Sequence, residues 1–419
     1  IYAVAYILFL PPLLPAQQVD TTAELTLDQA VELALRLSPS LAAGEAAVLA
    51  AGARVDQAGL LPNPEFDLEM ENFGGSGTLS GFDAAENTAA ISQAILLGGK
   101  RKKRQAGAVW ERVLAGRDFE AVRLDVIART TAAFYQVLVA QQREELGNEL
   151  FDLAESFAHT VQVRVDAGKV SPVEATRAKI EVARARAQRA RAVRDLQAAR
   201  ARLAATWGSN APAFRQVVGD LPEPATSPPL DLLRSFLMEA PEITRLADRV
   251  QLRQRVLEFE KSLRLPDLNI SVGRRRFEDI GQSAWVAAVS LPIPIFDRNQ
   301  GARKVANFEF EQARRSAEAV RIALDAELVA AFQRLDAAVQ DVTIANREIV
   351  PSSIAAFAAV ETGYREGKFG FLDVLDAQQA LFDARSLSLD SHEEYLLSRT
   401  DLERLVGRTL GNRNDPAPS

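Results

Sequence analysis

The chain has 419 residues, of which 47% are apolar and 25% charged, so it has enough apolar side chains to bury a substantial core. Its formal charge of -7, without a strongly basic region, argues against nucleic-acid binding. It contains no cysteine and only two histidines, His159 and His392. This composition excludes thiol chemistry, disulfides and Cys/His zinc sites, and neither histidine lies in a catalytic motif. We therefore expect no enzyme activity, no resident metal and no cofactor.

The first sixteen residues form an apolar stretch that precedes a polar sequence. It is interrupted by Pro11, Pro12 and Pro15, and it is too short and too rich in proline to span a bilayer as a helix. An apolar segment that ends at a small residue such as Ala16 is typical of a secretory signal. We interpret residues 1–16 as the remnant of a signal peptide, and a chance apolar run is the alternative.

The sequence repeats its landmarks roughly two hundred residues apart, which is typical of an internal duplication. Ser38-Pro39 corresponds to Ala240-Pro241 in an early helical pattern of each half. The segment between the halves is rich in proline and small residues, which favours a connector. We predict an internal two-fold repeat with a first repeat over 17–208, a connector over 209–229, a second repeat over 230–407 and a tail over 408–419.

An alternating segment in the first repeat predicts a strand. Residues 65–71 read EFDLEME, so acidic and apolar side chains fall on opposite faces of an extended chain. The acidic face consists of Glu65, Asp67, Glu69 and Glu71. Three further segments alternate less strictly. The strands that we predict are 64–72 and 87–97 in the first repeat, and 267–276 and 283–293 in the second.

Helical patterns fill most of the remaining sequence, so we predict a mixed α and β chain that is mainly α. A capping box at Thr26 begins a first helix that runs to about Leu61. Two long segments repeat apolar residues at steps of three and four, which favours helices packed along their length, and Pro351 is expected to kink or break the second. The further elements are long helix 99–166, turn 167–171 and helix 172–208, and then a first helix of the second repeat, long helix 301–366, turn 367–371 and helix 372–407.

Four amphipathic strands of about ten residues match membrane-spanning β-segments, but four strands are too few to close a barrel. Because open sheet edges are not tolerated in lipid, several copies would have to share one barrel, with eight strands in a dimer or twelve in a trimer. The carboxylates of the acidic strand would then face the lumen and favour cations. The alternative is a soluble antiparallel sheet whose acidic face meets water.

Several motifs resemble those of the TolC-like outer-membrane efflux channels. Residues 362–377, TGYREGKFGFLDVLDA, are similar to the second tip turn of that family. Residues 97–101, LGGKR, and 294–301, PIFDRNQG, are similar to the passages between strands and helices in its cobalt-zinc-cadmium, or CzcC-like, branch. Together with the repeat, the strand pairs and the long helices, the resemblance covers nearly all of the chain beyond residue 16.

The resemblance implies a homotrimer that completes a twelve-stranded barrel in the outer membrane of a Gram-negative bacterium. Long antiparallel helical hairpins would form an α-barrel tunnel through the periplasm. The implied partners are a periplasmic adaptor (a membrane fusion protein), an inner-membrane pump of the resistance-nodulation-division type, and outer-membrane lipid, with no nucleic acid. The implied function is passive conduction of substrates to the exterior, and the CzcC-like segments favour heavy-metal cations.

Two other functions remain open at this point. A TolC-type duct for drug efflux or type I protein secretion would use the same architecture, because the pump selects the cargo. A non-channel periplasmic helical adaptor would also contain long hairpins, but it would leave the four alternating strands without a role.

The two predicted turns supply the candidate site residues. By resemblance, Asp373 and Asp376 match aspartates that line the periplasmic constriction, where three copies would narrow and charge the pore as a gate. Alternatively, both carboxylates stabilise the start of a helix through its dipole. The resemblance also implies that the turns meet the adaptor. The candidate tip and adaptor contacts are Gly168, Lys169, Val170, Tyr364, Gly367, Lys368 and Phe369.

A basic run, KRKKR at residues 100–104, begins the first long helix. Cations at this end of a helix oppose its dipole, so the dipole does not explain them. We expect a solvated helix start, or contacts with anionic lipid headgroups beneath the membrane.

Overall fold

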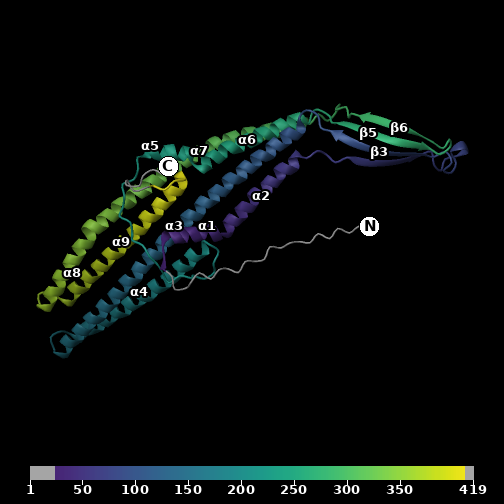
Figure 1. Ribbon diagram of the computed structural model, residues 1–419. Coiled ribbons are helices and arrows are strands. Elements are labelled where there is room, and N and C mark those ends of the chain that lie inside the picture. Colours follow the sequence, from purple (N-terminus) through teal and green to yellow (C-terminus); the bar gives the residue numbers. More distant parts are fainter. Residues whose placement is uncertain (1–23, 411–419) are drawn as a thin grey trace.

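The computed structural model describes residues 24–410, which form an elongated, curved bundle of helices with a small sheet at one end (Figure 1). The first half contains β1 (Glu24–Leu25), α1 (Leu27–Leu37), α2 (Pro39–Gly59), β2 (Glu65–Glu71), the short 3-10 helix η1 (Gly77–Leu79), β3 (Glu86–Ile95), α3 (Lys100–Asp166) and α4 (Pro172–Ala205). The predicted signal remnant at 1–16 and residues 411–419 of the predicted tail lie outside the described residues.

The second half follows the same order of long elements. It contains β4 (Gln216–Val217), α5 (Leu230–Glu239), α6 (Pro241–Ser262), β5 (Leu268–Phe277), β6 (Gln282–Ser290), α7 (Gln300–Ile344), the π-helical turn η2 (Ala345–Ile349), α8 (Val350–Arg365) and α9 (Phe371–Val406). Near the sheet, α2, α3, α6 and α7 pack in that order, and toward the other end α4 and α9 pack against α3.

Proline divides the first helix of each half. The sequence predicted one helix over 26–61, but α1 ends before Ser38 and α2 begins at Pro39, with a bend of 44°. Proline lacks an N–H and disfavours helical geometry at the preceding residue, and Ser38 accordingly has a ψ of 121°. Ala240 and Pro241 separate α5 from α6 in the same way. Within residues 24–410 no single helix is long and apolar enough to cross a membrane; only the bent pair α1–α2 reaches that length and composition together.

The two long helices differ in continuity. α3 runs unbroken through 67 residues, about 100 Å at the rise of an α-helix. The helix predicted over 301–366 is divided into α7 and α8 by η2, which ends two residues before Pro351. A proline ring collides with the carbonyl four residues earlier in a regular helix, here that of Arg347, and the wider π turn relieves this collision. The interruption that the sequence placed at Pro351 therefore lies at residues 345–349.

The sheet contains four antiparallel strands in the order β2-β3-β5-β6. Glu65 lies opposite Ser92 across β2 and β3, and Asn269 lies opposite Ser290 across β5 and β6. β6 ends at Ser290 instead of the predicted 293, because the prolines at 292 and 294 cannot donate ladder hydrogen bonds. Each outer strand, β2 and β6, has a neighbour on one side only within the described residues.

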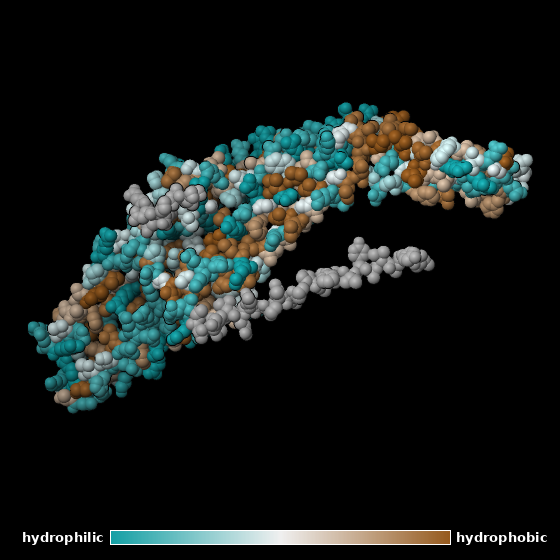
Figure 2. Space-filling model, in the orientation of Figure 1, coloured by the Kyte–Doolittle hydropathy of each residue, from teal (hydrophilic) through white to brown (hydrophobic). Residues whose placement is uncertain are grey.

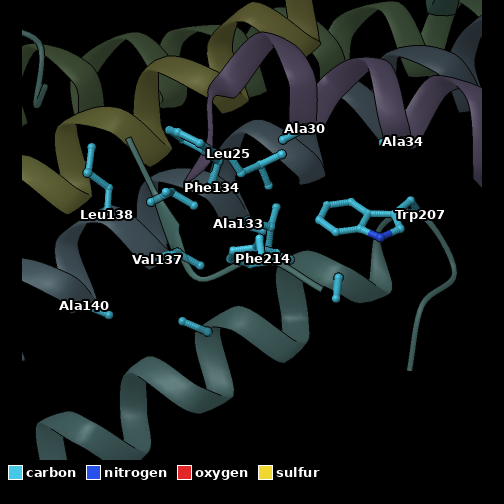
Figure 3. Packing of buried hydrophobic residues seen from close by; sticks show 14 of the residues in the cluster. Leu25, Ala30, Ala34, Ala133, Phe134, Val137, Leu138, Ala140, Trp207 and Phe214 are labelled. Atoms are coloured by element: carbon cyan, nitrogen blue, oxygen red, sulfur yellow. The ribbon is translucent and has the colours of Figure 1, made fainter. Parts of the chain in front are cut away.

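Three apolar clusters hold the helices together. The first joins α1, α3 and α4 to the segment after α4, where Phe134, Trp207 and Phe214 gather beneath α1 (Figure 3). In this cluster β4 pairs in parallel with β1, so the predicted connector at 209–229 contributes a short strand and core residues. The second cluster joins α5, α7 and α9, and the third joins α3, α4, α8 and α9 at the end far from the sheet.

Candidate functional site

The sheet has one polar face and one mainly apolar face, which also carries Arg274 and Arg276 of β5. Residues opposite each other in neighbouring strands point to the same side, so the four carboxylates of β2 share a face with Thr88, Ser92 and Ser271. The other face exposes large apolar side chains on all four strands, and Trp285 on the outer strand is 81% exposed. The exposed apolar set is Phe66, Leu68, Met70, Ile91, Ile270, Val272, Trp285 and Val289. A contiguous exposed apolar surface of this kind marks a contact with a partner protein or with lipid.

Arg275 links three strands across the polar face. Its Nη2 lies 2.8 Å from a carboxylate oxygen of Glu71, and its Nη1 lies 2.8 Å from one of Glu86. Its Nε donates to Thr88 Oγ1 at 2.8 Å. The sequence analysis did not identify this residue, although Arg275 lies four residues after Ser271 in the same strand and therefore points to the same face. Carboxylates still outnumber arginines on this face, because Glu65, Asp67 and Glu69 join the two that Arg275 contacts.

The passage from β3 to α3 is fixed by a largely buried ion pair. Lys100 Nζ lies 2.7 Å from Asp267 Oδ1, which also accepts the backbone N–H of Leu97 at 3.0 Å. Arg104 donates to the carbonyls at the end of α2, those of residues 58 and 60, at 2.8 Å each. The expectation of a solvated basic run is therefore wrong at Lys100, because its ammonium group is buried and paired with Asp267.

The passage from β6 to α7 presents apolar side chains on a well-ordered turn. Asn299 has a positive φ of 58°, and its Nδ2 donates to Glu260 Oε2 at 2.6 Å. Asp297 Oδ1 accepts the backbone N–H of Asn299 at 2.9 Å. Ile293 and Phe296 remain exposed, Phe296 by 90%. Figure 2 shows apolar surface gathered where the helices meet the sheet, so the apolar region extends beyond the strands.

The two turns at the end of the molecule far from the sheet have the same backbone geometry. Gly168 and Gly367 have φ values of 68° and 80°, which L-residues with a Cβ rarely adopt. The following N–H groups bind back to the helix, from Lys169 to the carbonyl of residue 164 at 2.9 Å and from Lys368 to that of residue 363 at 2.7 Å. Of the predicted tip contacts, five are exposed and Val170 is half-buried. The five are Gly168, Lys169, Gly367, Lys368 and Phe369.

Tyr364 corrects the predicted list of tip contacts. Its side chain is only 3% exposed and belongs to the third apolar cluster, with Phe157 and Phe371. The guanidinium of Arg164 lies 4.4 Å from the centre of the ring and donates to the Tyr364 carbonyl at 3.1 Å. Burial raises the pKa of the Tyr364 phenol, and the Arg164 charge opposes this shift. Tyr364 therefore joins the two hairpins and does not present a contact surface.

The two candidate gate residues lie at the start of α9. Asp373 Oδ2 accepts the backbone N–H of Gly370 at 2.7 Å, so this carboxylate caps the helix. Asp373 and Asp376 are both exposed, whereas Phe371 and Val374 in the same stretch of helix are buried. The two carboxylates thus share an outward face of α9, and one of them has a capping role as well.

The part of the chain described, residues 24–410, contains no group of three or more histidine, aspartate or glutamate side chains arranged to hold a metal ion. A cavity of about 740 Å³ lies between α1, α3 and α9 next to Arg399 and Glu403, which pair at 3.0 Å. The two sheet faces, the passages and the tips are the candidate functional features of the described residues.

A family model described as "Outer membrane efflux protein" matches residues 30–209 and 232–408. Among curated proteins, the cobalt-zinc-cadmium resistance protein CzcC of Cupriavidus metallidurans is 34% identical over 412 residues. The alignment covers 96% of this chain and 97% of CzcC.

Two solved structures share the fold over nearly the whole chain. A membrane protein from Pseudomonas aeruginosa matches with a TM-score of 0.80 at 20% identity, covering 91% of this chain and 90% of that one. CusC, described in terms of folding and transmembrane channel formation, matches with a TM-score of 0.77 at 17% identity, covering 91% and 92%. On the family match and the CzcC alignment, this chain belongs to the outer membrane efflux protein family.

Proposed function

We propose that three copies of this chain close one twelve-stranded barrel in the outer membrane and conduct substrates passively. One observation carries the proposal: a four-stranded sheet with an apolar exposed face and two outer strands that lack a second neighbour within the described residues. Unpaired strand edges are not tolerated in lipid, and a closed barrel removes them because every strand then has two neighbours. In the proposed barrel, β6 of one copy therefore pairs with β2 of the next. The polar face then lines the lumen.

The helices extend this barrel as a tunnel. Each half supplies two strands, one long hairpin and a shorter divided helix, which supports an internal two-fold repeat and twelve long helical rods around a trimer. Such a tunnel crosses the periplasm, and its tips meet a periplasmic adaptor and an inner-membrane pump of the resistance-nodulation-division type. The exposed tip residues, with Lys169 and Lys368 foremost, supply the contacts. This role requires no catalytic group.

Heavy-metal divalent cations are the proposed cargo. The similarity to CzcC, a cobalt-zinc-cadmium resistance protein, extends over almost the full length of both chains. The excess of carboxylates on the polar face of the sheet favours cations in a lumen lined by that face. Asp373 and Asp376 would add two acidic rings at the narrow end of the tunnel, because residues spaced by three share a helix face.

A deletion strain tests the cargo. We expect loss of the chain to raise sensitivity to cobalt, zinc or cadmium, and expression from a plasmid to restore tolerance. Unchanged metal tolerance together with increased drug susceptibility would reassign the channel to drug efflux. As a control for folding, the complementing strains should contain equal amounts of protein in the outer-membrane fraction.

Conductance in planar bilayers tests the gate. Asp373→Asn combined with Asp376→Asn should weaken block by divalent cations, because the two acidic rings lose their charge. Asp166→Asn, at the end of α3, is a matched control on the first hairpin. A double variant that conducts like the original protein would leave the carboxylates as helix-capping groups only.

A further inference from the structure

A basic pocket lies between α2, α3 and α6, directly below the sheet. It has a volume of about 440 Å³. Four cationic side chains line it, Arg54 from α2, Lys103 and Arg104 from α3, and Arg255 from α6, against the single carboxylate of Glu111. This composition is opposite in sign to the acidic face of the neighbouring strands.

The pocket exists because α3 has small residues where α2 and α6 flank it. Gly107 and Ala108 form its floor. A Cβ added to Gly107 would meet nothing within 4 Å, so the space above this residue is open. The backbone of α3 is regular there, and the opening is therefore produced by side-chain size and not by a distortion of the helix.

Two of the four cations are engaged within the fold. Arg104 donates to backbone carbonyls at the end of α2, and Arg255 Nη1 lies 2.9 Å from Glu258 Oε2. Within residues 24–410, no ion pair joins Arg54 or Lys103 to a carboxylate. The guanidinium of Arg54 and the ammonium of Lys103 therefore line one cavity without a carboxylate partner, and two such charges together would bind an anion of high charge density.

The start of α3 links the pocket to the polar face of the sheet. Asp267 precedes β5 and continues the alternation of Asn269, which lies on the polar face. Lys100 reaches Asp267 from the start of α3. Residues 100, 104, 107 and 111 follow helical steps of four and three, so they share one face of α3. This face of α3 therefore runs from the pocket lining to the ion pair at the base of the sheet.

We propose that this pocket binds a soluble polyvalent oxyanion of the phosphate class, held by Arg54 and Lys103. The forked donors of arginine match the oxygen geometry of phosphate, and the volume accommodates pyrophosphate together with several waters. The binding site itself does not depend on the proposed channel. In the proposed trimer, three such pockets would lie below the sheet.

Titration calorimetry of the full chain in detergent, with inorganic pyrophosphate as the probe, tests the site. We expect saturable binding that weakens with added salt, because the contacts are between charges. Arg54→Ala combined with Lys103→Ala should weaken binding by roughly tenfold or more, because a charge-assisted hydrogen bond contributes more to binding than a neutral hydrogen bond does. Absence of saturable binding to the original protein, or equal binding by this variant, overturns the proposal.

A second pair of variants separates the site from general effects. Gly107→Phe fills the pocket and should abolish binding, whereas Gly116→Phe places the same ring on α3 where a Cβ also meets nothing, outside the pocket. Equal loss in both variants would contradict a site at Gly107. Binding is measured without a membrane, so intact pyrophosphate binding by a protein that fails to conduct in bilayers would support the site while contradicting the proposed channel.

Discussion

The two long hairpins are built to the same plan but differ in continuity. α3 is one rod, and it meets α4 at a turn closed by Gly168. The corresponding rod of the second half is interrupted by η2 next to Pro351, and its turn at Gly367 leads into a helix capped by Asp373. The first hairpin is therefore a rigid support, and the second contains a built-in weak point about twenty residues from its tip.

Contacts between the hairpins compensate for this weak point. The third apolar cluster places Tyr364 and Phe371 of the second hairpin against Phe157 and Val161 of the first. Arg164 adds a cation–π contact to Tyr364 from the first hairpin. We therefore expect the first hairpin to help hold the second tip in place.

The largest expected effect comes from Tyr364→Ala. Removing a buried aromatic ring typically costs about 3–5 kcal/mol, and here the loss falls on the contact between hairpins. We expect faster hydrogen exchange and faster proteolysis in the second tip, and smaller changes in the first. A change of equal size in both tips would contradict the view that the first supports the second.

Tyr364→Phe is the matched control. The Tyr364 hydroxyl is buried without a hydrogen-bond partner in the described part of the chain, so its removal should alter local stability by less than about 1 kcal/mol. Exchange rates close to those of the original protein are expected. If the phenylalanine variant behaved like the alanine variant, the ring packing would not be the source of the effect.

Pro351→Ala should remove much of the difference between the hairpins. A regular helix through residues 345–351 regains the backbone hydrogen bond that proline lacks, and we expect slower exchange there, with a gain of about 1–3 kcal/mol in local stability. Pro172→Ala is a control, because Pro172 is at the first position of α4, where proline is tolerated. Equal effects at both prolines would argue against η2 as the weak point.

The tip glycines should respond alike. Gly168→Ala and Gly367→Ala each force a Cβ into a left-handed conformation, at a cost of about 1–2 kcal/mol. Gly116→Ala, in the regular part of α3, should instead stabilise its helix slightly. Local hydrogen exchange at the two turns measures the effect. A much smaller cost at Gly367 would mean that its turn relaxes more easily than the first.

The smallest effect is expected at the cap of α9. Asp373→Ala removes the acceptor for the Gly370 N–H and should cost about 1 kcal/mol or less, whereas Asp373→Asn keeps an acceptor and should cost less. Asp376→Ala is the control one turn later. Exchange in the first turn of α9 provides the measurement, and identical behaviour of the three variants would remove the capping role.

The sequence predicted most elements because their signals are local. Alternation in residues 65–71 predicted β2, and Pro351 predicted the break in the second long helix. Pro39 and Pro241 carried an equally clear signal, but the prediction continued the helical pattern through both. The direction of Tyr364 was not predictable, because a tip residue is exposed in an isolated hairpin and is buried here only by the other hairpin.

The residues that the sequence analysis did not identify have partners that are distant in the sequence. Arg275 acts on Glu86, 189 residues away in sequence, and the basic pocket combines residues from three helices of both halves. No spacing rule brings such groups together before the register of the sheet and the packing order of the helices are known. The acidic strand was predicted because its four carboxylates come from one segment.

Closure of the barrel by neighbouring copies is tested most directly by cross-linking between the two outer strands. The chain has no cysteine, so Leu68→Cys on β2 and Ala287→Cys on β6 introduce the only thiols. A short thiol-reactive cross-linker applied to outer membranes should give a ladder of covalent species that ends at three copies. Cross-links confined to single chains, or no species larger than one chain at full labelling, would contradict the shared barrel.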